Sequence, residues 1–227
     1  MTELAQRLSQ VRGEIASECQ RLGRQEPTLI VVTKNQPVQL ASDLLDLGET
    51  DFGENRVQEA LSKSQELELA RPANPVNWHI IGQLQTNKVR QALQFATSIH
   101  SLDRRPLLEE LHKRTLDRAM PLEVFIQVNL TDDDARGGIR INDLLPFANL
   151  VNETASLNLR GLMAVASLDR APERDFEVVA GLSELLRKEI PSADQLSIGM
   201  SGDFLAALAY GATHLRIGTA ITGNRVY

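Results

Sequence analysis

The stretch LIVVTK, residues 29–34, opens the series of apolar runs that decides the fold. Four apolar residues, three of them β-branched, precede Thr33 and Lys34, and Pro37 follows shortly afterwards. A run of this kind, bounded by a turn signal, is typical of a short buried strand. Lysine is rarely fully buried unless it is paired or functional, so Lys34 at the strand tip has two interpretations. Either its stem covers apolar surface while its amine reaches solvent, or the amine has a function.

Seven further apolar runs follow, and they alternate with longer, charged, amphipathic stretches. This alternation predicts βαβ units and a parallel sheet. Eight strands are the number that closes a (β/α)8 TIM barrel, although the chain is a little shorter than the typical length of about 250 residues. An open doubly wound sheet is the alternative, but no GxGxxG motif follows any strand. The predicted strands are 29–34, 51–55, 77–82, 98–103, 123–130, 159–167, 195–201 and 214–221.

A helix is predicted ahead of the barrel, over residues 2–23, because apolar residues recur there at steps of three and four and Gly23 is a plausible stop. That stripe is Leu4, Leu8, Val11, Ile15, Cys19 and Leu22. The alternation runs to the end of the chain without a linker, which predicts one domain, 1–227, including an N-terminal helical segment, 1–23. The other predicted helices are 38–48, 56–70, 84–96, 104–118, 141–153, 173–189 and 203–211.

The charge balance narrows the function classes. The net charge is −6 and the pI is about 5.3, which argues against a general nucleic-acid or anionic-membrane binder. Cys19 is the only cysteine and the four histidines are scattered, so neither a disulfide within the chain nor a metal site is predicted. The N-terminus has no signal-peptide pattern and no apolar run is long enough to span a membrane. These features predict a cytoplasmic protein.

In a TIM barrel, active-site residues lie at the carboxyl ends of the strands. A lysine enclosed at such a mouth loses hydration, which lowers its pKa and frees the amine as a nucleophile for Schiff-base formation with a carbonyl. This favours a functional Lys34. The other predicted strand ends are small and polar: Glu54, Asn55, Gly82, Ser101, Asp103, Asn129, Ala166, Ser167, Met200, Ser201, Gly202, Gly218 and Thr219.

Two glycine-rich segments predict a phosphate site. IGMSGD (198–203) follows the seventh predicted strand, and RIGTAITG (216–223) includes the end of the eighth. TIM barrels often bind phosphate with these two loops, because exposed backbone N–H groups there can point at an anion. Each segment alone is ordinary loop and capping sequence, with Ser201 to Asp203 capping a helix that begins near Phe204. Their occurrence together favours phosphate.

A carbonyl-capturing lysine and a phosphate cradle in one barrel suggest pyridoxal 5′-phosphate, and a sugar-phosphate aldolase would also fit. Arg216 helps to choose between them. It lies two residues before Gly218, so both share a strand face and Arg216 could donate a hydrogen bond to a pyridine nitrogen. The alternative is an ion pair of Arg216 with Asp103 or Asp203.

The chain closely resembles the YggS/PROSC-type (PLPBP-type) pyridoxal phosphate homeostasis proteins over nearly its whole length. The segments WHIIGQLQTNK and LSIGMSGD are the more specific matches. The matching segments are VVTK (31–34), FGENRVQEA (52–60), WHIIGQLQTNK (78–88), IHSLD (99–103), QVNL (127–130), GLMAV (161–165), LSIGMSGD (196–203) and GATHLRIGTAITGNRVY (211–227).

The resemblance implies a barrel like the N-terminal domain of alanine racemase, of fold type III, with pyridoxal 5′-phosphate as a Schiff base on Lys34. It also implies a protein that holds or delivers the cofactor inside the cell and affects amino-acid and keto-acid balance, without a robust catalytic activity. The implied recipients are pyridoxal-phosphate-dependent apoenzymes or a regulatory protein. The implied cofactor-binding residues are Lys34, Asn55, Met200, Ser201, Arg216, Gly218 and Thr219.

Three positions depart from the family pattern. Arg56 ends the segment GENR, where GENY is commoner in the family. Arg136 takes the place of the lysine that usually precedes the glycine, and Ile198 takes the place of a methionine. None of them removes Lys34 or the two glycine-rich loops. Arg56 and Arg136 are interpreted as solvated loop charges, with a partner surface as the alternative.

The sequence favours a binding protein over an enzyme. An arginine beside the pyridine nitrogen leaves that nitrogen unprotonated and weakens the ring as an electron sink. A small amino-acid racemase or lyase, the alternative, would also need a second acid–base group. In alanine racemase a partner chain's extra domain supplies it, and this chain ends at Tyr227. Tyr210 is placed on a helix, and His79 is interpreted as a satisfied barrel residue rather than a weak base. The missing second domain also suggests a monomer.

Overall fold

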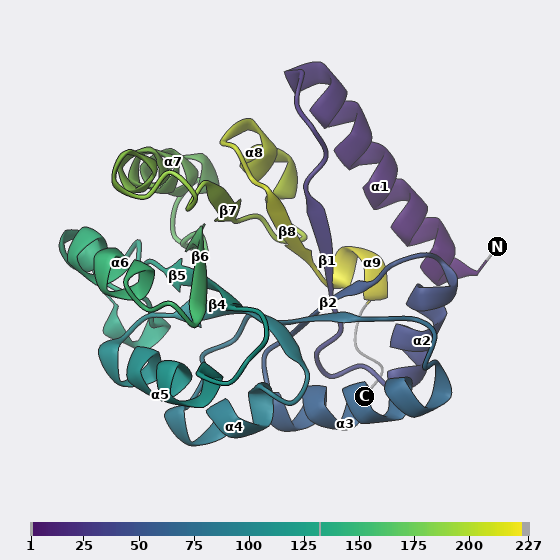
Figure 1. The fold of residues 1–227 in the computed structure, drawn as a ribbon. Coiled ribbons are helices and arrows are strands. Elements are labelled where there is room, and N and C mark those ends of the chain that lie inside the picture. The colour runs from purple at the N-terminus through teal and green to yellow at the C-terminus, as the bar shows by residue number, and fades with distance from the viewer. Residues whose placement is uncertain (1, 132, 224–227) are drawn as a thin grey trace.

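Eight parallel strands close into a barrel in the computed structural model, which describes residues 2–131 and 133–223 (Figure 1). Strands adjacent in the chain are adjacent in the barrel, and the last strand pairs with the first. The predicted (β/α)8 architecture is therefore confirmed. The strands are β1 (Thr28–Val32), β2 (Asp51–Glu54), β3 (Asn77–Ile80), β4 (Ala96–Leu102), β5 (Leu122–Gln127), β6 (Leu157–Met163), β7 (Gln195–Ser197) and β8 (His214–Ile217).

Helices surround the barrel on its outer side (Figure 1). The α-helices are α1 (Glu3–Leu22), α2 (Val38–Asp46), α3 (Val57–Ala70), α4 (Val89–Ala92), α5 (Arg105–Thr115), α6 (Leu144–Asn152), α7 (Pro172–Glu189), α8 (Phe204–Ala209) and α9 (Thr219–Thr222). Short 3₁₀ turns are η1 (Thr86–Lys88), η2 (Asp134–Arg136) and η3 (Ile141–Asp143). Met1, Asp132 and residues 224–227, the last of which end the matching segment 211–227, lie outside the described residues.

The apolar strand runs follow from burial on both faces. Outward-facing side chains also contact one another: the rings of Phe52 in β2 and Trp78 in β3 have centroids 5.6 Å apart. Inward-facing side chains fill the barrel, where Ile30 of β1 pairs in register with Arg216 of β8. A strand covered on both faces needs apolar residues at consecutive positions, which is why these runs do not alternate.

The N-terminal helix α1 confirms its predicted stripe. Thr2 caps its start, since its hydroxyl accepts the N–H of Ala5 at 3.2 Å. Gly23 ends it in the left-handed region with φ 64°, a conformation that glycine adopts without steric cost. The helix lies along α8 and α9, and Arg12 forms a two-point ion pair with Glu49, at 2.9 and 2.6 Å, just before β2.

Several element ends differ from the predictions. The predicted strand over 214–221 ends at Ile217, and Thr219–Thr222 form α9 instead. The other apolar runs also continue past their strands, because residues such as Ile198 are buried under the loops at the barrel mouth. The helix predicted over 84–96 is a 3₁₀ turn followed by only four α-helical residues. Apolar spacing does not separate these two helix types in a segment this short.

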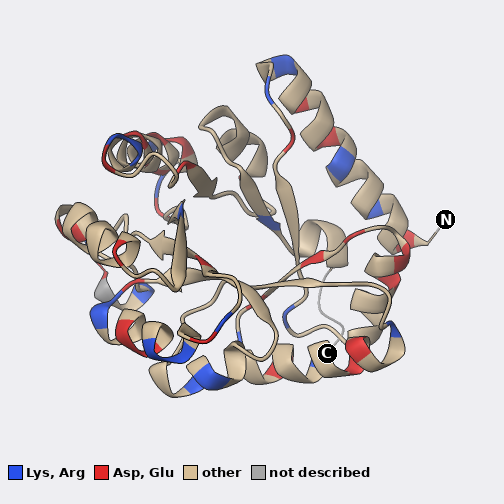
Figure 2. Cartoon of the chain, viewed as in Figure 1, with Lys and Arg blue, Asp and Glu red and all other residues tan. Residues whose placement is uncertain are grey.

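Both signs of charge lie on the outer helices (Figure 2). The helices α5 and α7 each carry acidic residues together with a basic last turn. Among the described residues, no helix is long and apolar enough to cross a membrane.

Gly161 is packed so closely that any side chain there should destabilise the fold. It lies in β6 with φ 151°, and a Cβ there would stand 1.8 Å from the carbonyl oxygen of Gln195 in β7. We expect Gly161→Ala to lower the free energy of unfolding by about 3 kcal/mol or more, because backbone must move to relieve the clash. Gly181→Ala, in α7 with open space around it, is the control and should stabilise by about 1 kcal/mol. Urea denaturation of both variants measures this, and equal effects would contradict it.

Candidate functional site

Lys34 lies at the mouth of the barrel, in the turn between β1 and α2. Val32 pairs with Gly53 of β2, and the N–H of Thr33 donates to the Gly53 carbonyl at 3.1 Å. Two residues further along both segments, the same register places Lys34 level with Asn55. Lys34 is half-buried, and its amine has no hydrogen-bond or ion-pair partner within the described part of the chain. A pocket of about 230 Å³ is lined by Lys34, Asn35, Asn55, Arg56 and Glu59.

Asn55 reaches this pocket because Gly82 leaves it room. Asn55 follows β2 and Gly82 follows the neighbouring strand β3. A Cβ on Gly82 would stand 2.6 Å from the Asn55 carbonyl oxygen and 2.7 Å from its Cα. The glycine therefore permits close packing of the two loops beside Lys34.

The loops after β7 and β8 meet at the mouth, as the sequence predicts. The Ser201 hydroxyl accepts the N–H of Gly218 at 3.2 Å and that of Ala220 at 3.3 Å. Within the described residues, the N–H groups of Ser201, Gly202 and Thr219 have no hydrogen-bond acceptor. Free N–H groups beside hydroxyls form a set of donors suited to an anion.

Met200 and Asp203 hold the first of these loops. Asp203 precedes α8, but its carboxylate does not cap that helix; it accepts the N–H of Met200 at 2.5 Å. Asp203 is the N-cap residue and the helix begins at Phe204, as predicted, but the predicted side-chain capping is wrong because the carboxylate binds the Met200 N–H instead. Burial raises the pKa of the Asp203 carboxyl.

Arg216 lies inside the barrel, where it is 4% exposed. It donates to the Ser197 carbonyl at 2.5 Å, to the Ser197 hydroxyl at 2.7 Å and to the Ala164 carbonyl at 2.9 Å. These bonds use Nη1 and Nη2, and none uses Nε. Arg216 forms no ion pair with a described carboxylate, so the alternative pairing with Asp103 or Asp203 is wrong. Burial lowers the pKa of Arg216 to about 10 against the opposing charge of Asp203.

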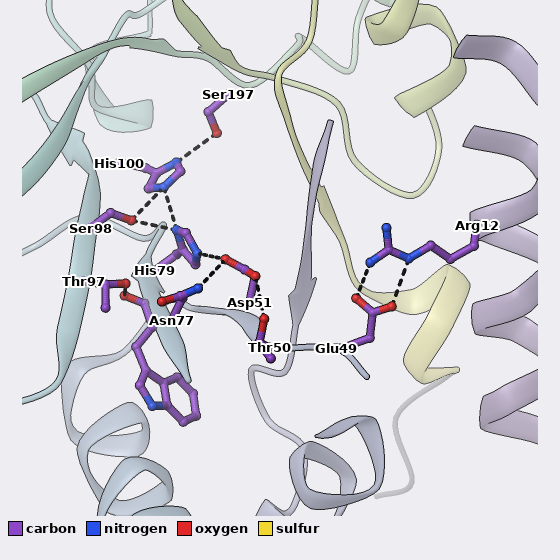
Figure 3. A network of polar contacts seen from close by, with 11 residues as sticks. Arg12, Glu49, Thr50, Asp51, Asn77, His79, Thr97, Ser98, His100 and Ser197 are labelled. Atoms are coloured by element: carbon purple, nitrogen blue, oxygen red, sulfur yellow. Dashed lines mark hydrogen bonds and ion pairs between the residues drawn. The ribbon is translucent and has the colours of Figure 1, made fainter. Parts of the chain in front are cut away.

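A hydrogen-bond network continues from Ser197 across the barrel interior (Figure 3). The Ser197 hydroxyl lies 2.9 Å from His100 Nδ1, and His100 Nε2 lies 3.1 Å from both His79 Nδ1 and the Ser98 hydroxyl. His79 Nε2 lies 3.0 Å from Asp51 at the opposite end of β2 from Asn55. The interpretation of His79 as a satisfied barrel residue is confirmed.

The network spans the barrel from end to end. Arg216 donates to the Ser197 hydroxyl, which is in turn in hydrogen-bond contact with His100 Nδ1. His100 contacts His79, and His79 contacts the carboxylate of Asp51. A chain of hydrogen-bonded side chains thus links a buried cation near the mouth to a carboxylate at the far end.

The buried histidines make stability depend on pH. Burial lowers the pKa of His100 well below its ordinary value and that of His214 to about 3. The unfolded chain binds protons on both near pH 6.5, so between pH 6.5 and about 3 it binds more protons than the folded chain. The free energy of unfolding should fall with falling pH in this window, by up to about 1.4 kcal/mol per pH unit for each histidine.

Urea denaturation at several pH values measures this dependence. His214→Gln should reduce the slope of the unfolding free energy against pH by up to about 1.4 kcal/mol per pH unit, the contribution of one proton. An unchanged slope would contradict the prediction.

Sequence reasoning missed the polar network that continues from Arg216 through Ser197 to His100 and Ser98. Their only signal is a polar residue at an inward position of an otherwise apolar strand. TIM-barrel interiors are usually filled by branched apolar side chains, so such a residue is an exception. Which polar residues meet depends on register between strands far apart in the chain.

Two departures from the family pattern, Arg56 and Arg136, lie at the rim, whereas Ile198 is buried. Arg56 is exposed and precedes α3, while Arg136 donates to the Ala166 carbonyl at 3.1 Å and so joins two loops. Arg136 is therefore more than a solvated charge. Tyr210 ends α8 and its ring lies near Phe176, 6.3 Å between centroids.

Comparisons with known proteins agree with this geometry. The family model "Alanine racemase, N-terminal domain" matches residues 7–226, which defines the class of barrel. The pyridoxal phosphate homeostasis protein of Escherichia coli (strain K12) is 37% identical over 232 residues, covering 100% of this chain and 99% of that protein. Its namesake from Vibrio alginolyticus is 34% identical over 232 residues and all of both chains. The chain belongs to the family of pyridoxal phosphate homeostasis proteins.

A solved structure supports the same assignment. PipY of Synechococcus elongatus PCC7942, with pyridoxal phosphate bound, superposes with a TM-score of 0.85 at 31% identity. The match covers 96% of this chain and 99% of that one.

Proposed function

We propose that this chain binds pyridoxal 5′-phosphate covalently through Lys34 and takes part in homeostasis of that cofactor inside the cell. The observation that carries the proposal is the unpartnered, half-buried amine of Lys34 at the barrel mouth. The family and the PipY complex support it. When bound, pyridoxal phosphate supplies an aldehyde that condenses with a lysine amine and a ring that acts as an electron sink.

The residues at the mouth fit the chemical groups of the cofactor. The loop of Ser201 and the loop of Gly218 and Thr219 offer hydroxyl and free N–H donors for a phosphate. The strand β8, which these last two residues follow, is the direct neighbour of β1, which precedes Lys34. The phosphate donors of this loop and the Lys34 amine therefore follow two adjacent strands.

Roles for the remaining residues follow from where they lie. Arg216 would donate toward the pyridine nitrogen from a position held by Ser197. Asn55 would lie beside the bound ring, level with Lys34. Met200 would shape the phosphate loop through its backbone, because its N–H is already engaged by Asp203.

We propose a binding role rather than catalysis. A racemase or lyase needs an acid–base group besides Lys34. His79 and His100 are hydrogen-bonded on both ring nitrogens, and Tyr210 lies at the end of α8 beside Phe176. A small pyridoxal-phosphate-dependent racemase or lyase remains the second candidate, favoured only by the family's alanine racemase fold.

The absorption spectrum of the purified protein, before and after borohydride, tests the cofactor proposal. A yellow band that disappears on reduction, with a phosphopyridoxyl mass on Lys34, is the expected result. A colourless protein that stays unmodified after incubation with the cofactor would refute it.

Two further measurements test the finer proposals. Exchange of solvent deuterium into the α-position of free amino acids at a useful rate would favour the enzyme. Transfer of the cofactor to a pyridoxal-phosphate-dependent apoenzyme, or capture by a regulatory protein, would identify a recipient. Sedimentation tests the expected monomer.

A further inference from the structure

A buried cluster of charged side chains lies under the turn that carries Lys34. We call Glu54, Glu59 and Lys63 the turn-anchoring cluster. The Lys63 amine lies 2.7 Å from Glu54 Oε1, 2.7 Å from Glu59 Oε1 and 2.7 Å from the Thr33 carbonyl oxygen. A lysine ammonium has three N–H donors, so all three are used.

The cluster is costly to bury. Lys63 is 5% exposed and Glu54 is fully buried, with its second carboxylate oxygen unpartnered. Burying an ion pair costs desolvation that the attraction between the charges often only offsets, so such a pair is weak evidence for stability alone. Stability alone therefore does not explain why these charged side chains are buried together.

The cluster's partners are the two neighbours of Lys34. The Thr33 hydroxyl donates to Glu54 Oε1 at 2.7 Å, and its carbonyl accepts from Lys63. On the other side, the Asn35 N–H donates to Glu59 Oε1 at 2.5 Å. Asn35 has φ 57°, in the left-handed region that is uncommon for residues other than glycine. The cluster thus fixes the backbone before and after Lys34 and leaves its amine unpartnered.

We propose that Glu54, Glu59 and Lys63 are positioning residues for Lys34, setting the direction in which its amine leaves the turn. This inference rests on the function proposed for Lys34. Attack of an amine on an aldehyde needs a defined approach, and a misplacement of about 1 Å can lower such a rate by about 100-fold. Side chains that hold both flanking residues restrict that approach without touching the amine.

The chain offers a matched control at the other end of the same strand. Glu49 precedes β2 and forms a two-point ion pair with Arg12 (Figure 3). Glu54 ends that strand. Glu49→Gln weakens a part-buried ion pair far from Lys34. The test variants are Lys63→Met and Glu59→Ala, and Glu59→Gln keeps an oxygen that can accept the Asn35 N–H.

Three readouts on the full chain test the proposal. Amide hydrogen exchange over residues 33–36, without cofactor, should speed up about tenfold or more in Lys63→Met and Glu59→Ala. The rate of adduct formation with added pyridoxal phosphate should fall about tenfold or more. The induced circular dichroism of the bound chromophore should also change. Glu59→Gln should restore most of each readout, and Glu49→Gln should move none of them.

The outcomes separate this inference from the proposed function. Unchanged exchange in the turn, or unchanged circular dichroism and adduct rate, in folded Glu59→Ala would overturn the positioning role. If Lys63→Met does not fold, the partly exposed Glu59 still decides the question. Failure of the unaltered protein to form an adduct on Lys34 would refute the proposed function instead, and the exchange data would still report whether the cluster holds the turn.

Discussion

Lys34→Ala is expected to abolish the covalent adduct with pyridoxal phosphate completely. The substitution removes the amine that forms the bond, and no other described lysine lines the pocket beside Asn55. The Lys34 side chain is half-buried and its amine has no partner among the described residues, so the free energy of unfolding should change by less than about 1 kcal/mol. Borohydride reduction followed by peptide mass mapping, together with urea denaturation, measures both effects.

Lys88→Ala provides the control for this variant. Lys88 is another half-buried lysine, in η1 after β3, and it does not line the pocket. It should keep the full adduct on Lys34. A phosphopyridoxyl group trapped on another lysine in Lys34→Ala, at the level of the unaltered protein, would contradict the assignment.

Arg216→Met should have the second-largest effect, on both the cofactor's spectrum and the stability. Removing the guanidinium leaves the Ser197 hydroxyl and the Ala164 carbonyl without their donor inside the barrel, while the Ser197 carbonyl keeps only the N–H of Ala164. Unpaired buried groups of this kind cost about 1–3 kcal/mol each, so a loss of about 3 kcal/mol or more is expected. Loss of a donor toward the pyridine nitrogen should also shift the absorption band of the bound cofactor.

Arg24→Met separates the two effects. Arg24 donates to the carbonyls of Leu208 and Ala212, outside the mouth. Its removal should lower stability and leave the spectrum unchanged. A folded Arg216→Met protein with an unchanged spectrum would mean that Arg216 does not touch the ring.

The sequence alone predicted the architecture well. Eight apolar runs correspond to eight strands, and the stripe from Leu4 to Cys19 corresponds to the buried face of α1. These are local patterns, since a strand covered on both faces and a helix covered on one each require a characteristic spacing of apolar residues. The placement of Lys34 at the mouth followed once the barrel was assumed, because strand ends in a parallel barrel share one face.

The sequence predicted element ends less well. The strand predicted to residue 221 ends at Ile217, and the carboxylate of Asp203 turns to Met200 instead of capping α8. Local spacing cannot tell whether an apolar residue is buried within a strand or under a loop. Likewise, a carboxylate near a helix start has several N–H groups in reach, and packing selects one.

By itself, then, the sequence determined the barrel, the position of Lys34 on it and the two glycine-rich loops. Only the tertiary structure decided what surrounds them. Lys63 is nine residues after Glu54 and thirty after Thr33, yet its amine contacts both. Ser197 links Arg216 to His100, from strands about a hundred residues apart. Hydrogen bonds and ion pairs act over a few ångströms, so partners distant in the chain become identifiable only when strand register and helix packing bring them together.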